Sequence, residues 1–159
     1  MAGAQRGYAA GPALQGREAA PPGALGAPAP LPGHRYTSWV PTFRVAKTGF
    51  RFNAVHSFPN DHGYDRLPHG HDYEFTVMLE GELDGEGMLY DLRGLKTLVE
   101  YAVIAPLDHR NLDAILEHPS LEALASWIWE QLRPAVPAHL RLGLTLWETR
   151  SLYVEFWGT

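Results

Sequence analysis

Three histidines occupy positions from which they could bind one metal ion. His69 and His71 flank a single glycine in PHGHDY, and His56 lies upstream in FNAVHSF. Residues two apart on a β-strand point to the same face, so His69 and His71 would project together. If the strand that carries His56 pairs with theirs, three imidazole nitrogens converge and leave a fourth position open, as in catalytic zinc sites. The alternative is an ordinary cluster of hydrogen-bonded histidines without a metal.

A second candidate group is the adjacent pair Asp108 and His109 in PLDHRNLD. A carboxylate beside an imidazole can set its tautomer and raise its basicity, which suits proton transfer. The alternative is that Asp108 only caps a short turn.

A third candidate is Glu148 in WETR, which ends a row of leucines that share one parity, Leu140 to Leu146. A carboxylate there could accept two N–H groups from the guanidine-like edge of a heterocycle such as a pterin. The alternative is a strand-end carboxylate that faces water.

The composition excludes several classes of site. No cysteine occurs among the 159 residues, which rules out disulfides, thiolate zinc sites, iron–sulfur clusters and a cysteine nucleophile. The formal net charge of −5 and the absence of a basic stripe argue against nucleic-acid binding. No apolar run of about 20 residues could span a membrane. The first residues lack the apolar core of a secretory signal, so we expect a cytoplasmic protein.

Alternating apolar residues predict strands at both ends of a folded domain over residues 36–159. Residues 43–58, 71–83 and 140–149 alternate, and residues 151–158 are expected to form a last strand. The connection at 57–68 is longer than a tight hairpin needs, and such loops often carry function. Residues 1–35 are rich in Ala, Gly and Pro and predict a disordered extension.

Two helices are predicted between these strand pairs. The first follows a cap at Asp91, and the second runs from a cap at Ser120 to a stop at Pro134. Their apolar stripes comprise Leu92, Leu95, Leu98, Val99 and Ala102 in the first helix, and Leu121, Leu124, Ala125, Ile128 and Leu132 in the second. The order ββααββ indicates an α+β fold, an antiparallel sheet with two helices on one face.

The motifs FNAVHSF, HGHDY, GMLYDLRGLK, LDHRNLD and ET, in this order, resemble the 6-pyruvoyl-tetrahydropterin synthase family over about residues 43–157. This family includes the bacterial 6-carboxy-tetrahydropterin synthases of queuosine biosynthesis. The resemblance implies a tunnelling fold whose subunits join their sheets around a barrel. It also implies a homo-oligomer, a trimer or a hexamer of two stacked trimers, with active sites between subunits.

The same resemblance implies roles for the candidate residues. Zn²⁺ would be held by His56, His69 and His71, and Asp108 and His109 would form the proton-transfer pair. Glu148, with Thr149 beside it, would anchor the pterin. The implied activity is that of a zinc-dependent lyase on dihydroneopterin triphosphate or a similar substrate.

One position departs from the family pattern. The catalytic cysteine of the family lies four residues before the first histidine of H-x-H, where this chain has Asp65. Asp65 could replace the thiol as the base, with Asp61 and His62 as other candidates in the same loop. The departure leaves open a redirected lyase or cyclase step, an aldolase or cyclase of specialised metabolism, a non-catalytic module that binds a pterin-like ligand, and a purely structural metal.

Overall fold

The computed structural model describes residues 41–60 and 63–158. The predicted extension at 1–35 and the predicted domain start at residue 36 lie outside this range. Strands β1 (Phe43–His56) and β2 (His69–Gly81) form a long antiparallel hairpin, and β4 (Arg141–Trp147) and β5 (Tyr153–Phe156) continue the sheet antiparallel to β2. The four predicted strands are thus confirmed.

A fifth strand was not predicted. The two-residue strand β3 (Arg110–Asn111) pairs parallel to β1 at Ala54 and Val55, which gives the sheet order β3-β1-β2-β4-β5. The sheet of the described residues is therefore antiparallel except at this edge. Two residues are too few to show the alternation by which a strand is recognised in a sequence.

A β-bulge in β1 decides which side chains face the core. The pairing with β2 shifts register between Lys47 and Phe50, and Gly49 within the bulge has a φ of 82°. An extra residue in one strand reverses its facing parity. After the bulge every second residue up to the strand end is buried: Phe50, Phe52, Ala54 and His56.

The first predicted helix is a composite of three segments. It runs through α1 (Leu92–Val99), the π turn η2 (Glu100–Ile104) and α2 (Ala105–Leu107), and the Asp91 carboxylate caps its start by accepting a hydrogen bond from the Arg93 N–H. Its buried residues recur every fourth position: Leu95, Val99, Val103 and Leu107. The predicted stripe is wrong at Leu92, which is 39% exposed, whereas Ala102 is partly buried against the core beside the fully buried Val103. A π turn holds more residues than an α turn, which favours a spacing of four.

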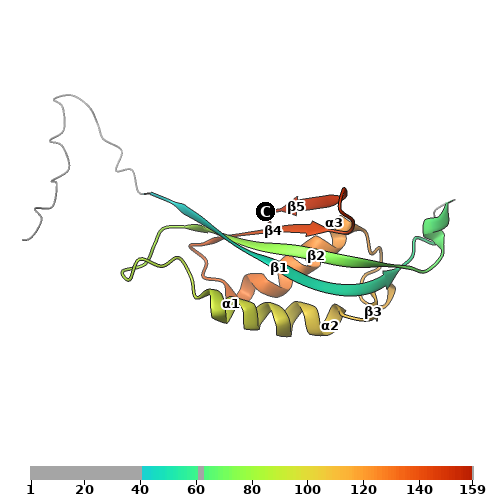
Figure 1. Ribbon diagram of the computed structural model, residues 1–159, viewed down its shortest axis with the longest axis horizontal. Coiled ribbons are helices and arrows are strands. Elements are labelled where there is room, and N and C mark those ends of the chain that lie inside the picture. Colours follow the sequence, from blue (N-terminus) through green and yellow to red (C-terminus); the bar gives the residue numbers. More distant parts are fainter. Residues whose placement is uncertain (1–40, 61–62, 159) are drawn as a thin grey trace, which may run out of the picture. The chain divides into compact units, whose positions relative to one another are not determined.

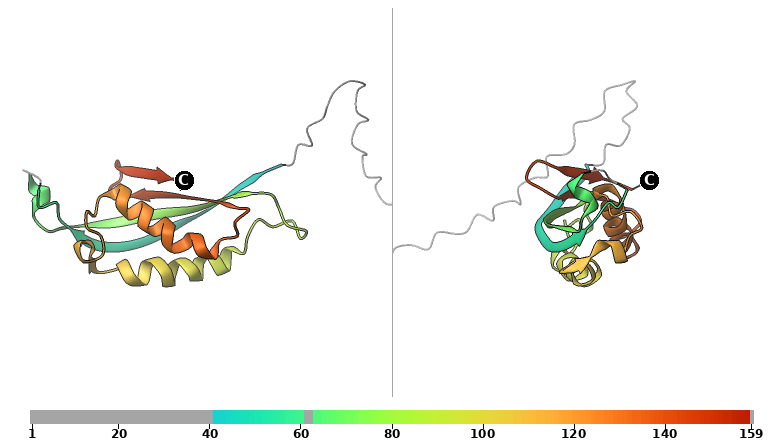
Figure 2. Two further views of the ribbon diagram at one scale, coloured as in Figure 1. Left: turned by 180° about the vertical axis from the view of Figure 1, so that it is seen from behind. Right: turned by 90° about the vertical axis from the view of Figure 1, so that its right-hand side faces the viewer.

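The second predicted helix is α3 (Leu121–Leu132). The Ser120 hydroxyl caps it by accepting a hydrogen bond from the Ala123 N–H, and a short 3₁₀ turn (Arg133–Ala135) follows at Pro134. Its five predicted stripe residues are all buried. Figures 1 and 2 show the helices on one face of the sheet. Within the described ranges, every helix is too short or too polar to cross a membrane.

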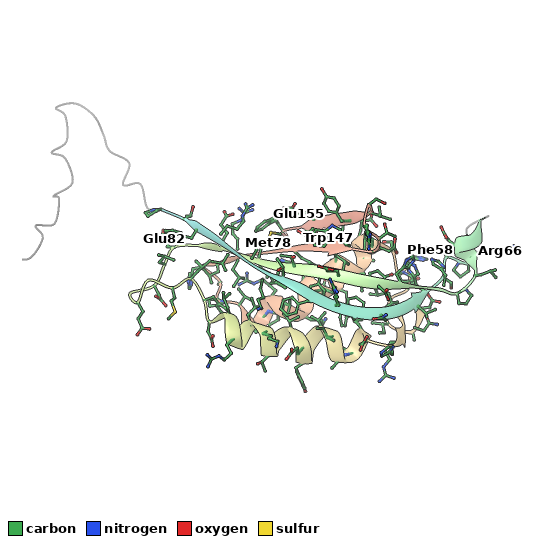
Figure 3. The ribbon with its side chains drawn as sticks, in the orientation of Figure 1. Phe58, Arg66, Met78, Glu82, Trp147 and Glu155 are labelled. Atoms are coloured by element: carbon green, nitrogen blue, oxygen red, sulfur yellow. The ribbon has the colours of Figure 1, made fainter. Side chains whose placement is uncertain are left out.

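The core lies between the sheet and these helices. Apolar residues of β1, β2 and β4 meet those of the helical segments in one buried cluster, and Figure 3 shows side chains filling this space. The β1–β2 connection, where Phe58 and Arg66 are labelled in Figure 3, contains a 3₁₀ turn at Tyr64–Arg66. The candidate histidines lie at the strand ends that this connection joins.

Candidate metal centre

The β1–β2 register brings the three predicted histidines together. His56 lies directly opposite His69, and Ala54 lies opposite His71, so two strand ends place three imidazoles on one side. One ring nitrogen from each of the three lies within 4.8 Å of the others. Their ring centroids are 4.5–5.0 Å apart. The predicted convergence is therefore present in a single chain.

Hydrogen bonds orient two of these rings for metal binding. His56 Nδ1 lies 2.9 Å from the Pro119 carbonyl oxygen, and His69 Nδ1 lies 2.8 Å from the Leu67 carbonyl oxygen. A carbonyl only accepts hydrogen bonds, so each Nδ1 carries the proton and each Nε2 keeps a free lone pair. This is the tautomer that a metal-binding histidine needs.

The inner nitrogen of His56 has no hydrogen-bond partner. His56 is 1% exposed, and its Nε2 is buried without a hydrogen bond. A buried polar atom without a partner is destabilising, and a bound cation would satisfy it. The residues present thus fit a metal ion better than a self-contained histidine cluster.

Glu148, directly after β4, lies against the same histidines. Its Oε1 is 3.4 Å from His56 Nε2, 3.6 Å from His71 Nε2 and 3.4 Å from the Tyr73 hydroxyl, which donates to it. The Glu148 side chain is only 12% exposed. The alternative of a carboxylate facing water is therefore wrong.

Burial and the Glu148 charge act on two neighbouring groups. Burial lowers the pKa of His71, assisted by His56 and His69 and opposed by the Glu148 carboxylate. Burial raises the pKa of the Tyr73 phenol, and the charge and hydrogen bond of Glu148 raise it further. His71 is thereby biased towards the neutral form that binds metals, and Tyr73 stays a hydrogen-bond donor.

Asp108 and His109 both hydrogen-bond to the backbone of one β1 residue, Asn53. Asp108 Oδ1 accepts a hydrogen bond from the Asn53 N–H at 2.9 Å, and the His109 N–H donates to the Asn53 carbonyl at 2.6 Å. His109 adopts a left-handed φ of 57°, and its Nε2 lies 3.6 Å from Asp108 Oδ2. Asp108 is therefore not a turn cap; Asn111 takes that place by accepting from the Asp113 N–H.

Asp65 and Thr149 lie at the margins of the cluster. Asp65 Oδ1 is 3.9 Å from His69 Nε2, and the Asp65 side chain is 60% exposed. Asp61 and His62 are outside the described residues. Thr149 is exposed, and its hydroxyl oxygen accepts hydrogen bonds from the N–H groups of Ser151 and Leu152, which shape the β4–β5 turn.

An open hollow of about 1200 Å³ runs from the histidine cluster to His109. Residues from both lie along it, among them His71, Glu148 and His109. Trp147, labelled in Figure 3, also lines it from the end of β4. One chain thus offers a ligand space that reaches both groups.

Two residues of this region were missed by the sequence interpretation as site residues. Tyr73 shares strand parity with His69 and His71, so its phenol could have been assigned to the site on that signal. Asn53 acts through its backbone, and its amide side chain also donates a hydrogen bond to Asp72. A contact made by the backbone does not depend on the residue type, so the sequence does not reveal it.

Comparisons with known proteins agree on one family. The model of the family described as 6-pyruvoyl tetrahydropterin synthase matches residues 44–159. The dihydroneopterin monophosphate aldolase of Pyrococcus furiosus is 37% identical over 105 residues, which cover 65% of this chain and 89% of the aldolase. The human 6-pyruvoyl tetrahydrobiopterin synthase is 33% identical over 96 residues, which cover 57% of this chain and 66% of the human protein. The solved structure of the Caenorhabditis elegans 6-pyruvoyl tetrahydropterin synthase superposes with a TM-score of 0.65 at 28% identity, covering 76% of this chain and 98% of that one.

Proposed function

This chain belongs to the 6-pyruvoyl tetrahydropterin synthase family, and on that premise we propose that it is a zinc-dependent lyase that cleaves the side chain of a phosphorylated dihydroneopterin. The observation that carries the proposal is the buried Nε2 of His56, which makes no hydrogen bond and faces two further imidazoles. Three nitrogen donors favour zinc over the oxygen-preferring divalent ions. When bound, zinc supplies a Lewis acid that lowers the pKa of a substrate hydroxyl.

We favour cleavage of a carbon–carbon bond over elimination of phosphate. The chain has no cysteine to act as a thiolate base, and its aldolase relative from Pyrococcus furiosus is covered over 89% of its length. In the retro-aldol step, a base takes the proton of the hydroxyl on the second side-chain carbon. The bond between the first and second carbons breaks, its electrons pass into the conjugated ring, and the first carbon takes up a proton. The products are a hydroxymethyl-dihydropterin and a two-carbon aldehyde phosphate.

Asp65 beside the histidines and His109 on the hollow suit the two proton transfers. Asp65 lies at the cluster beside His69 and is our candidate for the base. His109 lines the hollow next to Asp108, and this pair is our candidate for returning a proton to carbon. Asp65 is the carboxylate at the position where the family places its thiol, so its role replaces that of the missing group.

Assembly into a trimer or hexamer is part of the proposal. The edge strands of the described sheet, β3 and β5, leave backbone groups unpaired on their outer sides. Edges of this kind are suited to pairing with another copy. In such an assembly, Asp108 and His109 of a neighbouring copy could serve the site in place of those in the same chain. Light scattering of the purified chain would test the assembly, and a stable monomer would contradict it.

Turnover of defined substrates tests the proposal. Purified full chain loaded with Zn²⁺ is incubated with dihydroneopterin monophosphate or triphosphate, and the products are identified by mass spectrometry. We expect the two-carbon aldehyde phosphate from the monophosphate, with a rate about 100-fold lower in Asp65→Asn. Glu82→Gln is the matched control, since Glu82 lies at the far end of the hairpin from Arg66 (Figure 3). Release of inorganic triphosphate would indicate synthase chemistry instead, and binding without products would indicate a ligand-binding module.

A further inference from the structure

We propose that Asp113 is a positioning residue that fastens the segment carrying Asp108 and His109 to the end of β1, next to His56. The Asp113 carboxylate thereby fixes where the His109 backbone lies relative to the histidine cluster. This inference deepens the proposed function and rests on it for the role of His109 in proton transfer. The contacts that carry it are made by protein groups alone.

The Asp113 carboxylate accepts two hydrogen bonds from the residue that directly follows β1. Its Oδ1 accepts from the Ser57 N–H at 3.0 Å, and its Oδ2 accepts from the Ser57 hydroxyl at 2.8 Å. Ser57 is only 7% exposed. Hydrogen bonds to an ionised carboxylate are stronger than those between neutral groups, and two of them also fix its direction. The contact therefore joins two parts of the chain that are 56 residues apart in the sequence.

This contact begins where the β1–β2 ladder stops. The last paired residues of the ladder are His56 and His69. The next N–H of the chain, that of Ser57, donates to Asp113 instead. On its other side, β1 pairs with β3 over only two residues. The Asp113 carboxylate therefore extends the attachment between the two segments to the residue adjacent to His56.

The same segment is attached to β1 at its other end by Asp108 and His109. Asp108 Oδ1 accepts from the Asn53 N–H at 2.9 Å, and the His109 N–H donates to the Asn53 carbonyl at 2.6 Å. The attachments at Asn53 and Ser57 lie on either side of the β3 pairing, at the end of β1 (Figure 1). A segment held at two points of one strand cannot slide along that strand unless one attachment breaks.

The position of His109 depends on these attachments, because its own side chain is held weakly. The side chain is 80% exposed, so packing restrains it little. Its backbone φ of 57° lies in the left-handed region, which a residue other than glycine keeps only when surrounding contacts enforce it. The backbone therefore sets where the imidazole lies, and the contacts with β1 set the backbone.

Asp113 is itself oriented by the turn to which it belongs. Its N–H donates to Asn111 Oδ1 at 3.0 Å, and this cap begins the 3₁₀ turn Leu112–Ala114. Leu112 is fully buried and anchors the turn in the core. An acidic residue in a first turn can serve the N–H groups of that turn. Both oxygens of Asp113 instead accept from Ser57, so its carboxylate acts between segments.

Amide hydrogen exchange of the metal-free full chain tests the inference. In Asp113→Ala we expect the N–H groups of His109 and Asn53 to exchange about 10- to 100-fold faster than in the wild type, because the segment opens more easily without the two hydrogen bonds to Ser57. Glu117→Ala is the matched control, since Glu117 is an exposed carboxylate of the same part of the chain. It should leave both exchange rates unchanged.

A second control separates positioning from a general loss of stability. Gly143→Ala places a Cβ against the Trp157 ring, far along the sequence from this segment. It should speed exchange at Val77, a fully buried residue of β2, because that N–H exchanges through global unfolding. The His109 N–H exchanges through local opening and should keep its wild-type rate in Gly143→Ala.

Turnover links the contact to the proposed chemistry. With Zn²⁺-loaded protein and dihydroneopterin monophosphate, Asp113→Ala should lower kcat about 10-fold and leave KM within about 2-fold, because a displaced imidazole affects proton transfer more than binding. Asp113→Asn keeps one acceptor, and its amide can donate to the Ser57 hydroxyl. This variant should restore most of kcat and of the slow exchange at His109.

An unchanged exchange rate at His109 in Asp113→Ala would overturn the inference, as would an equal acceleration in Glu117→Ala or Gly143→Ala. Faster exchange with an unchanged kcat would make Asp113 a structural contact only and would also overturn it. Should Asp113→Ala not fold, Ser57→Ala takes its place, with an expected acceleration of about 3- to 10-fold for one lost hydrogen bond. If the wild type turns over no dihydroneopterin phosphate, the proposed function fails, and the exchange rates alone decide whether Asp113 positions His109.

Discussion

His56 and His69 face each other across the β1–β2 ladder, with imidazole centroids 4.5 Å apart. They lie at the loop end of the β1–β2 hairpin, His56 as the last residue of β1 and His69 as the first residue of β2. The side chain of His71 joins them because it is two residues along β2 from His69. The proposed metal centre is therefore built by strand register, and its ligands move only if the hairpin does.

Replacing one histidine should abolish metal binding without unfolding the protein. His56→Ala should abolish the rise in melting temperature that saturating Zn²⁺ gives the wild type, because ligand stabilisation requires the native site. A zinc concentration 100 times Kd corresponds to about 2.7 kcal/mol of stabilisation in the wild type. Differential scanning calorimetry with and without Zn²⁺ measures this difference.

His139→Ala is the matched control, since His139 is exposed and outside the cluster. It should keep the zinc-dependent shift in full. A shift of equal size in His56→Ala would contradict the assignment of this residue as a ligand.

Substitutions at Asp108 should distinguish its charge from its structural contact. Asp108→Asn keeps an oxygen for the Asn53 N–H, so it should fold normally while turnover falls about 100-fold. Asp108→Ala removes that acceptor and should also lower the free energy of unfolding by about 1 kcal/mol. Denaturant titration and steady-state kinetics on the same samples make the comparison. Full activity in Asp108→Asn would show that the carboxylate has no part in proton transfer.

Gly143 should tolerate no side chain. A Cβ there would lie 2.5 Å from ring atoms of Trp157, whose indole also lies under the guanidinium groups of Arg44 and Arg141. Displacing the indole should lower the free energy of unfolding of Gly143→Ala by about 1–3 kcal/mol. Gly85→Ala, where nothing lies within 4 Å of the added carbon, should change it by less than about 0.5 kcal/mol. Equal stability of the two variants in urea would refute this packing argument.

Lowering the pH should remove the contribution that the Glu80 ion pairs make to the free energy of unfolding. Hydrogen bonds from Arg44, and then from Arg141, lower the pKa of Glu80 in the folded protein. A lowered carboxyl pKa stabilises the fold above the ordinary value of about 4.3 and loses that effect as pH falls through the folded value. The stability difference between wild type and Glu80→Gln should therefore be constant near neutral pH and shrink below about pH 4. Urea titrations of the metal-free proteins over this range measure it, and a difference independent of pH would contradict the ion pairs.

Local patterns predicted the elements and the histidine cluster, because both depend on short-range periodicity. Alternation placed His56 on the buried face of β1, and Asp91 and Ser120 marked the helix starts through the capping bonds that the structure contains. The π turn and the strand β3 were not predictable in this way. A single widened turn and a two-residue pairing are decided by tertiary packing.

The position of Glu148 required information that a single strand does not hold. The leucine row of β4 showed which face Glu148 shares, but its contact with His56 depends on β4 pairing with β2 in one register. Strands far apart in the sequence choose their register through contacts along the whole sheet. The sequence therefore pointed to Glu148 as a site candidate and left its neighbours undetermined.

X-ray absorption at the zinc edge of the purified, zinc-loaded full chain tests the central claim most directly. The account predicts one ion per chain with outer-shell scattering from three imidazoles and bonds of about 2.0–2.1 Å to nitrogen. The imidazole signal should fall by one ring in His56→Ala and stay unchanged in His139→Ala. A spectrum dominated by oxygen ligands without imidazole scattering, or the same spectrum in His56→Ala, would contradict a metal centre on these three histidines.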